Sequence, residues 1–194
     1  MMKQNTLLGF ALALLCLLGV SSSATSPGQA SPGVRVWLRE TWTVSYRARV
    51  QGDWLVVEVT HQPGWHTYSM DNVIRAREKS GKIRPETEIP TLITPLDGIT
   101  IRGGWRQSPP LDLSTPDIRW YTWGFEGQSY FAVRIDKATL PSSVQIYAQA
   151  CTEEICAMVD SLVVPVEPSE TAGQQWVDPE SLVAVASDVE QEER

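Results

Sequence analysis

The chain has 194 residues, with 16 lysines and arginines against 23 aspartates and glutamates, which gives a formal net charge of −7. Hydrophobic residues make up 42%, and glycine and proline number 13 each, a balance typical of a globular protein rather than of a disordered or collagen-like chain. The excess of acid excludes the basic surface that a nucleic-acid-binding protein needs. The length suits one domain with terminal extensions.

The first 24 residues have the pattern of a secretory signal peptide. Lys3 supplies the positive start, residues 7–20 carry no charge, and small residues precede the expected cleavage after Ala24. The uncharged run is shorter than the roughly 20 apolar residues that span a bilayer, so an uncleaved anchor is the less favoured alternative. Cys16 lies mid-run after two leucines rather than at a cleavage site, which argues against a lipoprotein anchor. We therefore expect an exported chain without a membrane span.

Alternating side chains predict a hairpin after a flexible leader at 25–33. From 42 to 50, apolar and polar residues alternate with the period of two that is typical of a strand with one buried face. A turn at 51–53 precedes the run 54–60 (WLVVEVT), which reads as the return strand. The dipeptide Pro63-Gly64 ends that strand.

The middle of the chain is predicted to be short strands and loops. Residues 69–90 show no clear period, so we expect a loop there with at most one helical turn. Residues 103–118 are rich in proline and glycine, and long loops in compact domains are often functional. The remaining strands are expected at 91–94, 98–102, 130–135, 144–150 and 158–166.

Eight or nine short strands and no convincing amphipathic helix predict an all-β, immunoglobulin-like β-sandwich over 34–166, expected to be a monomer. Residues 167–194 hold eight acidic residues and one arginine, so almost all of the net charge lies in this tail. Such a composition predicts a solvated, largely disordered extension.

Cleavage of the signal peptide would leave two cysteines, Cys151 and Cys156, in a compartment where disulfides persist. They lie between the last two predicted strands, so a hairpin would let their sulfurs meet. Cys151 has the parity of Gln149 and not of the apolar Ala150, which predicts that it faces the surface. Closing a six-residue loop contributes only about 2 kcal/mol on the chain-entropy model. A local, surface-facing disulfide is the kind that exchanges, although a structural hairpin disulfide remains the alternative.

The order of several motifs resembles a known family. Residues 63–68 (PGWHTY) follow the hairpin, 120–124 (WYTWG) follow the long loop, and Cys151 and Cys156 stand before the last strand. Over 34–166 this arrangement resembles the N-terminal periplasmic domain of the thiol:disulfide interchange protein DsbD. That family is an immunoglobulin-like sandwich whose two late cysteines take electrons from a membrane domain and pass them to periplasmic thiol-redox proteins.

The resemblance implies a role for each of these motifs. Cys151 and Cys156 would be the redox couple, and Tyr68 an aromatic side chain lining the site. The loop that covers the pair until a partner docks would be Trp120, Tyr121, Thr122, Trp123 and Gly124. The location would be periplasmic, no cofactor would be needed, and the partners would be thioredoxin-like proteins or a membrane electron donor on another polypeptide. The resemblance does not imply which cysteine attacks or in which direction the electrons flow.

Two other interpretations start from the remaining residues. His61 and His66 are the only histidines, and His66 with the cysteines would make a soft copper-type ligand set. We expect hydrogen-bonded or exposed histidines instead, and no metal. The loop tryptophans suggest a non-catalytic secreted module that binds peptide or carbohydrate and has a structural hairpin disulfide. A reduction potential below about −300 mV would indicate such a structural bond.

Overall fold

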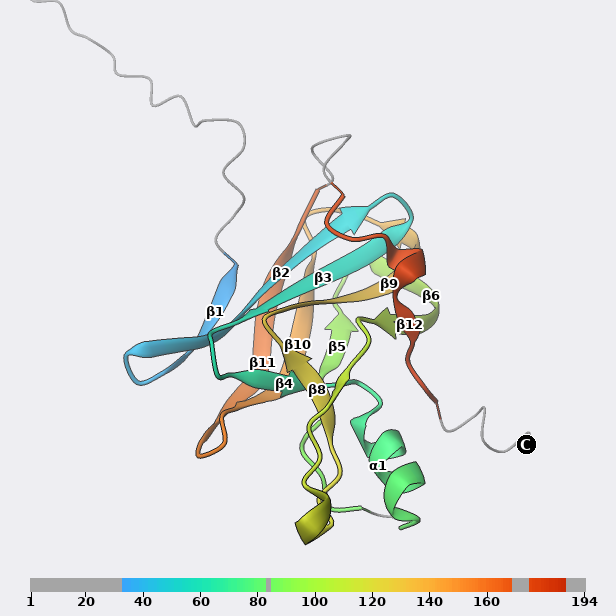
Figure 1. Cartoon of the computed structure of the whole chain (residues 1–194). Coiled ribbons are helices and arrows are strands. Elements are labelled where there is room, and N and C mark those ends of the chain that lie inside the picture. The colour runs from blue at the N-terminus through green and yellow to red at the C-terminus, as the bar shows by residue number, and fades with distance from the viewer. Residues whose placement is uncertain (1–32, 83–84, 169–174, 188–194) are drawn as a thin grey trace, which may run out of the picture. The chain divides into compact units, whose positions relative to one another are not determined.

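The computed structural model describes residues 33–82, 85–168 and 175–187. Within these ranges most residues lie in β-strands that form two sheets with a shared core (Figure 1). The prediction of an all-β, immunoglobulin-like sandwich is confirmed. The expected signal peptide at 1–24 and almost all of the leader at 25–33 lie outside the described residues. No helix that the structure describes is both long and apolar enough to cross a membrane.

The first sheet is antiparallel throughout, apart from one junction described below. Its strands, in spatial order, are β1 (Val34–Leu38), β2 (Thr41–Gln51), β3 (Trp54–His61), β9 (Gln128–Ala138), β6 (Ile99–Gln107) and β12 (Val183–Ala184). The predicted hairpin is confirmed, because Val44 of β2 pairs with His61 of β3, and Gln51 pairs with Trp54 at the turn.

The second sheet is built around β10. Its strands are β11 (Cys156–Glu167), β10 (Ser143–Cys151), β4 (His66–Tyr68), β8 (Trp123–Glu126) and β7 (Leu111–Asp112), while β5 (Leu92–Pro95) pairs with the first half of β10. At its far end β11 joins the first sheet, where Val166 and Glu167 run parallel to Ala48 and Arg49 of β2. One strand therefore connects both sheets.

The core lies between the sheets and is almost entirely aliphatic and aromatic. It includes Tyr46, Leu55, Val57, Phe125, Phe131, Val133, Val144, Ile146 and Val164. The apolar positions of β2 and β10 alternate with more exposed residues, as the sequence pattern predicts. Strand β3 differs because six of its eight residues in succession are buried, so both of its faces are covered.

The prediction of a loop with at most one helical turn at 69–90 is wrong, because α1 spans Asn72–Ser80. Only Asn72 and Ala76 of this helix are buried. A helix that buries so little needs no apolar stripe, and the sequence therefore gives no periodic signal for it. The amide of Asn72 ties the helix to β8 through Thr122 and the main chain of Trp123. Gly81 ends α1 in the left-handed conformation, with φ of 68°.

The segment 103–118 is also more ordered than predicted. Strand β6 continues to Gln107, and β7 and the 3₁₀ turn η1 (Pro116–Ile118) follow it. The bridge between Thr115 and Trp120 makes the β7–β8 connection a protruding hairpin, seen at the lower end of Figure 1. The predicted long loop is thus a two-stranded extension of the second sheet.

The prediction that the tail is disordered is wrong for residues 175–187, which pack on the outer face of the first sheet. Leu182 is 4% exposed and packs with Trp54, Val56 and Ala132. The 3₁₀ turn η2 (Pro179–Ser181) precedes it, and β12 pairs with β6. The prediction for residues 169–174 and 188–194 concerns residues outside those described.

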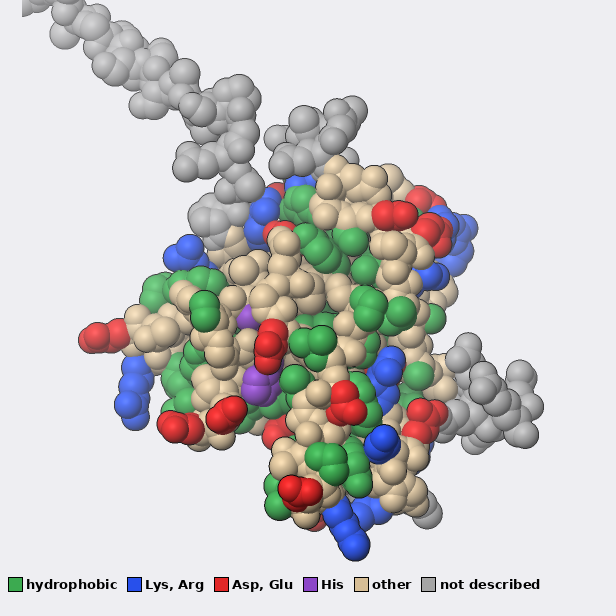
Figure 2. Space-filling view, in the orientation of Figure 1, with side chains coloured by type: hydrophobic (Ala, Val, Ile, Leu, Met, Phe, Trp, Pro, Cys, Tyr) green, Lys and Arg blue, Asp and Glu red, His purple; other side chains and the backbone are tan. Residues whose placement is uncertain are grey.

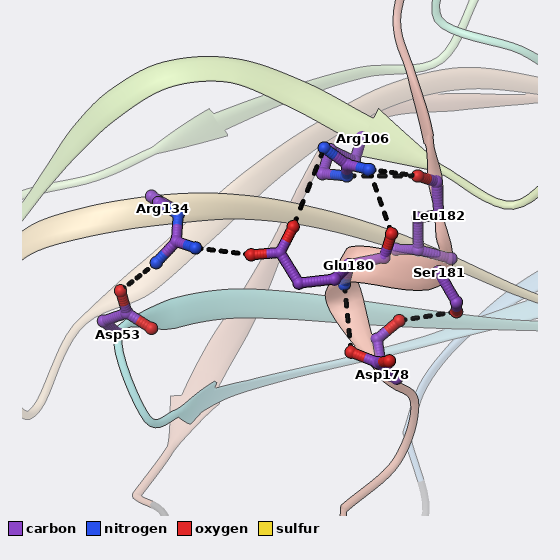
Figure 3. A network of polar contacts seen from close by, with 7 residues as sticks. All are labelled: Asp53, Arg106, Arg134, Asp178, Glu180, Ser181 and Leu182. Carbon is purple, nitrogen blue, oxygen red and sulfur yellow. Dashed lines mark hydrogen bonds and ion pairs between the residues drawn. The ribbon is translucent and has the colours of Figure 1, made fainter.

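Ion pairs and cation–π contacts hold residues 176–182 of this segment against the sheet. Arg134 lies between Asp53 and Glu180, and Arg106 donates to the carbonyl oxygen of Leu182 at 2.7 Å (Figure 3). At the other end the guanidinium of Arg49 stacks 3.7 Å from the centre of the Trp176 ring. The acidic tail is therefore partly neutralised by arginines of the sandwich.

Buried Asp71 joins the helix, β6 and the tail. Its carboxylate accepts hydrogen bonds from Arg75 Nε and Gln107 Nε2, both at 2.8 Å, and from the backbone N of Ala186 at 3.1 Å. Burial alone would raise the pKa of Asp71, but these hydrogen bonds outweigh it and hold the pKa below its usual range. The charged carboxylate thus stabilises the docked tail.

Candidate functional site

The two cysteines form a disulfide across the end of the β10–β11 hairpin. Cys151 and Cys156 are directly opposite each other, with their Cα atoms 4.0 Å apart. The neighbouring Thr152 N donates to Ile155 O at 2.8 Å, so the cysteines occupy a position without ladder hydrogen bonds, where opposite side chains come closest. The Thr152 hydroxyl oxygen also accepts from the backbone N of Glu154 and Ile155, which orders the turn. The expected pairing is confirmed.

The two cysteines differ sharply in exposure. Cys156 is exposed because β11 is the edge strand at this end of the sheet. Cys151 has the outward parity that the sequence indicated, and it lies outside the core cluster, but it is only 2% exposed. The predicted face is therefore right but the expected exposure is wrong, because Cys151 stands on that face between the side chains of Cys156 on β11 and His66 on β4.

The disulfide begins a row of neighbouring side chains that continues across the sheet to a histidine and a glutamate. Cys151 is opposite His66 of β4, and His66 is opposite Glu126 of β8. Directly opposite residues share one face of a sheet. Cys156, Cys151, His66 and Glu126 thus stand side by side on four successive strands, an arrangement that we call the cysteine row. The sequence analysis did not identify Glu126 as part of the site.

His66 is held by Tyr68, two residues along the same strand. Their rings meet edge to face at 5.3 Å, and His66 Nε2 and the Tyr68 hydroxyl are hydrogen-bonded at 3.0 Å. Burial lowers the pKa of His66, although the carboxylates of Glu126 and Glu153 act in the opposite direction. Burial, with the charge of Glu88, raises the pKa of Tyr68, so its hydroxyl keeps its proton. At neutral pH this pair is a neutral imidazole and a neutral phenol.

An open pocket of about 790 Å³ adjoins the row. Its lining residues are Gly64, His66, Tyr68, Glu88, Leu113, Thr115, Trp120, Thr122, Glu126, Thr152, Glu153 and Glu154. None of these described lining residues is a lysine or arginine. Histidine (purple) and carboxylates (red) are visible together on the face shown in Figure 2. Burial raises the pKa of Glu88. The pocket is therefore lined by aromatic and acidic side chains together.

The expected covering loop is divided between two sides of the second sheet. Trp120 and Thr122 line the pocket, on the same side as Tyr68. Trp123 instead borders a small second pocket beside α1. The main-chain carbonyl of Tyr121 accepts a hydrogen bond from the Thr87 hydroxyl at 2.8 Å. The structure thus brings only part of the predicted segment to the cysteine side.

Gly124 has a packing role in this segment. It lies opposite Tyr68, and a Cβ added there would come within 2.3 Å of the carbonyl oxygen of Thr67. Only glycine lets β8 approach β4 so closely, and this approach sets the distance between the hairpin and the cysteine row.

The second histidine has a structural role. His61 Nδ1 donates to the carbonyl oxygen of Gly127 at 2.9 Å, and Nε2 accepts from the Thr67 hydroxyl at 2.8 Å. Burial lowers the pKa of His61 to about 4, so its ring is neutral at neutral pH. In the described part of the chain, no three His, Cys, Asp or Glu side chains are arranged to hold a metal ion.

Comparison with known proteins finds similarity among solved structures. No protein-family model and no curated protein matches it. Among solved structures it is similar to the N-terminal domain of DsbD from Neisseria meningitidis in the reduced form, over 62% of this chain and 78% of that chain. The sequence identity is 14% and the TM-score 0.39.

Proposed function

We propose that this chain is an exported thiol–disulfide exchange module, which passes electrons between thiol-redox proteins through Cys151 and Cys156. The observation that carries the proposal is the unequal exposure of the two cysteines beside an open pocket. A partner thiolate has access to exposed Cys156, whereas Cys151 is 2% exposed. That division suits one sulfur for the mixed disulfide and the other for its resolution.

The chemistry follows from this asymmetry. In the oxidised domain, a partner thiolate attacks Cys156 Sγ, and the sulfur of Cys151 leaves as a thiolate. In the reduced domain the Cys156 thiolate attacks a partner disulfide, and Cys151 then attacks Cys156 Sγ to release the reduced partner. Two electrons move between dithiol and disulfide, and no cofactor takes part.

A structural role explains the bond less well. The hairpin is already paired from Ser143 opposite Pro165 to Ala150 opposite Ala157, and the Thr152–Ile155 hydrogen bond closes its end. Closing so short a loop contributes only about 2 kcal/mol. The disulfide therefore adds little that the backbone pairing does not already supply.

The pocket is the docking place for the partner in this proposal. Trp120 and Thr122 of the β7–β8 hairpin line it, and so do Glu153 and Glu154 of the turn between β10 and β11. A partner that reaches Cys156 would contact both. Export by the segment 1–24 would place the module in the periplasm, with its electron donor and acceptor on other polypeptides.

The test is the reduction potential of the pair, measured by equilibrating the protein with dithiothreitol redox buffers and counting free thiols. We expect a value above about −300 mV, in the range of exchanging disulfides. The variant with both cysteines replaced by alanine is the blank. A value well below −300 mV would favour the alternative, a non-catalytic binding module with a structural disulfide.

A further inference from the structure

We propose that His66 is the proton acceptor and donor for Cys151 during exchange, an inference that rests on the proposed function. The geometry that points to it is the pairing of the two residues. Cys151 on β10 and His66 on β4 are directly opposite, and such pairs on one face have Cβ atoms about 4.5–5.5 Å apart. The side chain of His66 is therefore the neighbour of Cys151 on the adjacent strand and on the same face of the sheet.

Burial of Cys151 creates the need for such a group. A thiol must lose its proton before its sulfur attacks a disulfide, and burial disfavours the thiolate. Exposed Cys156 can pass its proton to water, but Cys151 is 2% exposed and needs a nearby side chain. His66 is half-buried and continues the cysteine row from Cys151 into the pocket.

The hydrogen bond to Tyr68 leaves His66 able to hold either protonation state. In this proposal Nε2 keeps its proton in both states and donates to the oxygen of the Tyr68 hydroxyl, which itself remains protonated. Nδ1 is therefore the nitrogen that exchanges the proton. Because burial lowers the pKa of His66, the ring is neutral at neutral pH and available as a base.

The charges around Cys151 and His66 favour transfer of the proton from the cysteine to the histidine. Among the residues that the structure describes, the ionisable groups that interact with His66 or share its pocket are Glu126, Glu153, Glu154, Glu88, Tyr68 and His61. The carboxylates disfavour a lone thiolate on Cys151 and stabilise a cation on His66. Moving the proton from sulfur to imidazole thus places the positive charge beside Glu126 and next to the new thiolate.

The complete step balances as follows. The Cys156 thiolate attacks one sulfur of the partner disulfide, the partner bond breaks, and its leaving thiolate takes a proton from water. Cys151 then gives its proton to His66 and its sulfur attacks Cys156 Sγ, so that the mixed disulfide breaks. The second partner thiolate leaves and takes the proton from His66. The domain dithiol is oxidised and the partner disulfide is reduced by two electrons.

The test follows the two sulfurs separately. Reduced protein is mixed with 5,5′-dithiobis(2-nitrobenzoate) in a stopped-flow instrument, and each thionitrobenzoate released is recorded at 412 nm. The first release reports the attack by Cys156, and the second reports the attack by Cys151. In the wild type, we expect the second rate to rise with pH through the pKa of His66 and then to level off.

His66→Gln keeps a hydrogen-bonding side chain of similar reach but cannot carry the proton. It should slow the second release at pH 7 at least tenfold and remove the inflection, while the first release changes less than twofold. Glu126→Gln is the second variant. It removes a charge that favours protonated His66, so the inflection should move to lower pH.

The outcomes separate the two proposals. Unchanged second-phase rates and pH profiles in both variants, with the first phase intact, would overturn the role of His66 and leave the exchange function standing. Absence of any reaction in the folded wild-type protein would overturn both. If His66→Gln does not fold, the pH profile of Glu126→Gln decides whether His66 carries the proton. An inflection of the second release rate that stays at the wild-type pH would contradict the inference.

Discussion

The outer faces of the two sheets differ in whether another part of the chain covers them. On the first sheet, apolar Trp54, Val56 and Ala132 point away from the core, and the tail covers them with Leu182. On the second sheet, the corresponding face at the hairpin end carries Cys156, His66 and Glu126 and opens into a pocket. One face is closed by its own chain, and the other is left open.

The difference follows from the side chains that each face carries. Apolar side chains on a sheet face need cover, and the chain supplies it from 175–187 through Leu182, the arginine contacts and Asp71. Partly solvated, ionisable side chains need none, and their open face allows another molecule to approach. The predictions below test whether closure of the first face provides stability and openness of the second provides reactivity.

The largest effect should come from removing the cover. A chain that ends at Pro168 loses Leu182 and the bond from Ala186 to Asp71, and exposes Trp54 and Val56. We expect a loss on the order of 4 kcal/mol in the free energy of unfolding, or about 10 °C in Tm, by thermal denaturation. A chain ending at Ser187, which keeps these contacts, is the control. Equal stability of the two truncations would show that the cover contributes nothing.

Asp71→Asn tests the hydrogen bonds by which buried Asp71 holds the segment 175–187. The variant keeps the shape but loses the charge that accepts hydrogen bonds from Arg75, Gln107 and Ala186, which should cost about 2 kcal/mol at pH 7. Since the folded pKa of Asp71 is lowered, its contribution is complete above the unfolded value of about 4 and is lost as pH falls through the folded pKa. Denaturant unfolding at pH 7 and pH 3 should show the variant's deficit shrinking in acid. A deficit that does not depend on pH would contradict this account.

Removal of the disulfide should have a smaller effect on stability. With both Cys151 and Cys156 replaced by alanine, we expect the domain to remain folded and to lose no more than about 2 kcal/mol in denaturant unfolding. The hairpin pairing of β10 and β11 supplies the rest of the order. An unfolded double variant at room temperature would mean that the bond is a structural requirement.

The smallest effect should come from the β7–β8 hairpin. Trp120 lines the pocket, so Trp120→Ala should speed reduction of the disulfide by dithiothreitol a few-fold, with the reduction potential moving by less than roughly 30 mV. Trp123, which borders α1 instead, is the matched control, and Trp123→Ala should leave the rate unchanged. Equal rates in all three proteins would remove the covering role of this hairpin.

The sequence predicts the sandwich because its strands alternate locally. Strands β2, β9, β10 and β11 follow from patterns of apolar residues bounded by turn residues, and β3 follows as the return strand after the turn at 51–53. The four successive apolar residues at the start of β3 also carry information that alternation alone misses: Trp54 and Val56 on the face opposite the core imply a cover. The sequence could not say which segment supplies it, because the apolar residues Trp176, Val177, Pro179 and Leu182 of the described tail follow neither a strand period nor a helix period.

The same limit applies to α1 and to the site. The helix is held by the amide of Asn72 rather than by an apolar stripe, so no periodic signal marks it. The cysteine pair is readable from spacing, but the burial of Cys151 and its neighbour His66 depends on β4, which is about 85 residues away in the chain. Such pairings between distant strands have no local signature in one sequence.

The measurement that tests the central claim most directly compares the two cysteines one at a time. Cys151→Ala leaves Cys156 as a lone thiol, and Cys156→Ala leaves Cys151. Both variants are reacted with 5,5′-dithiobis(2-nitrobenzoate) at pH 7, with folding checked by circular dichroism. Because Cys156 is exposed and Cys151 is 2% exposed, the account predicts that the Cys151→Ala protein reacts at least tenfold faster. Equal rates, or a faster reaction of the Cys156→Ala protein, would contradict it.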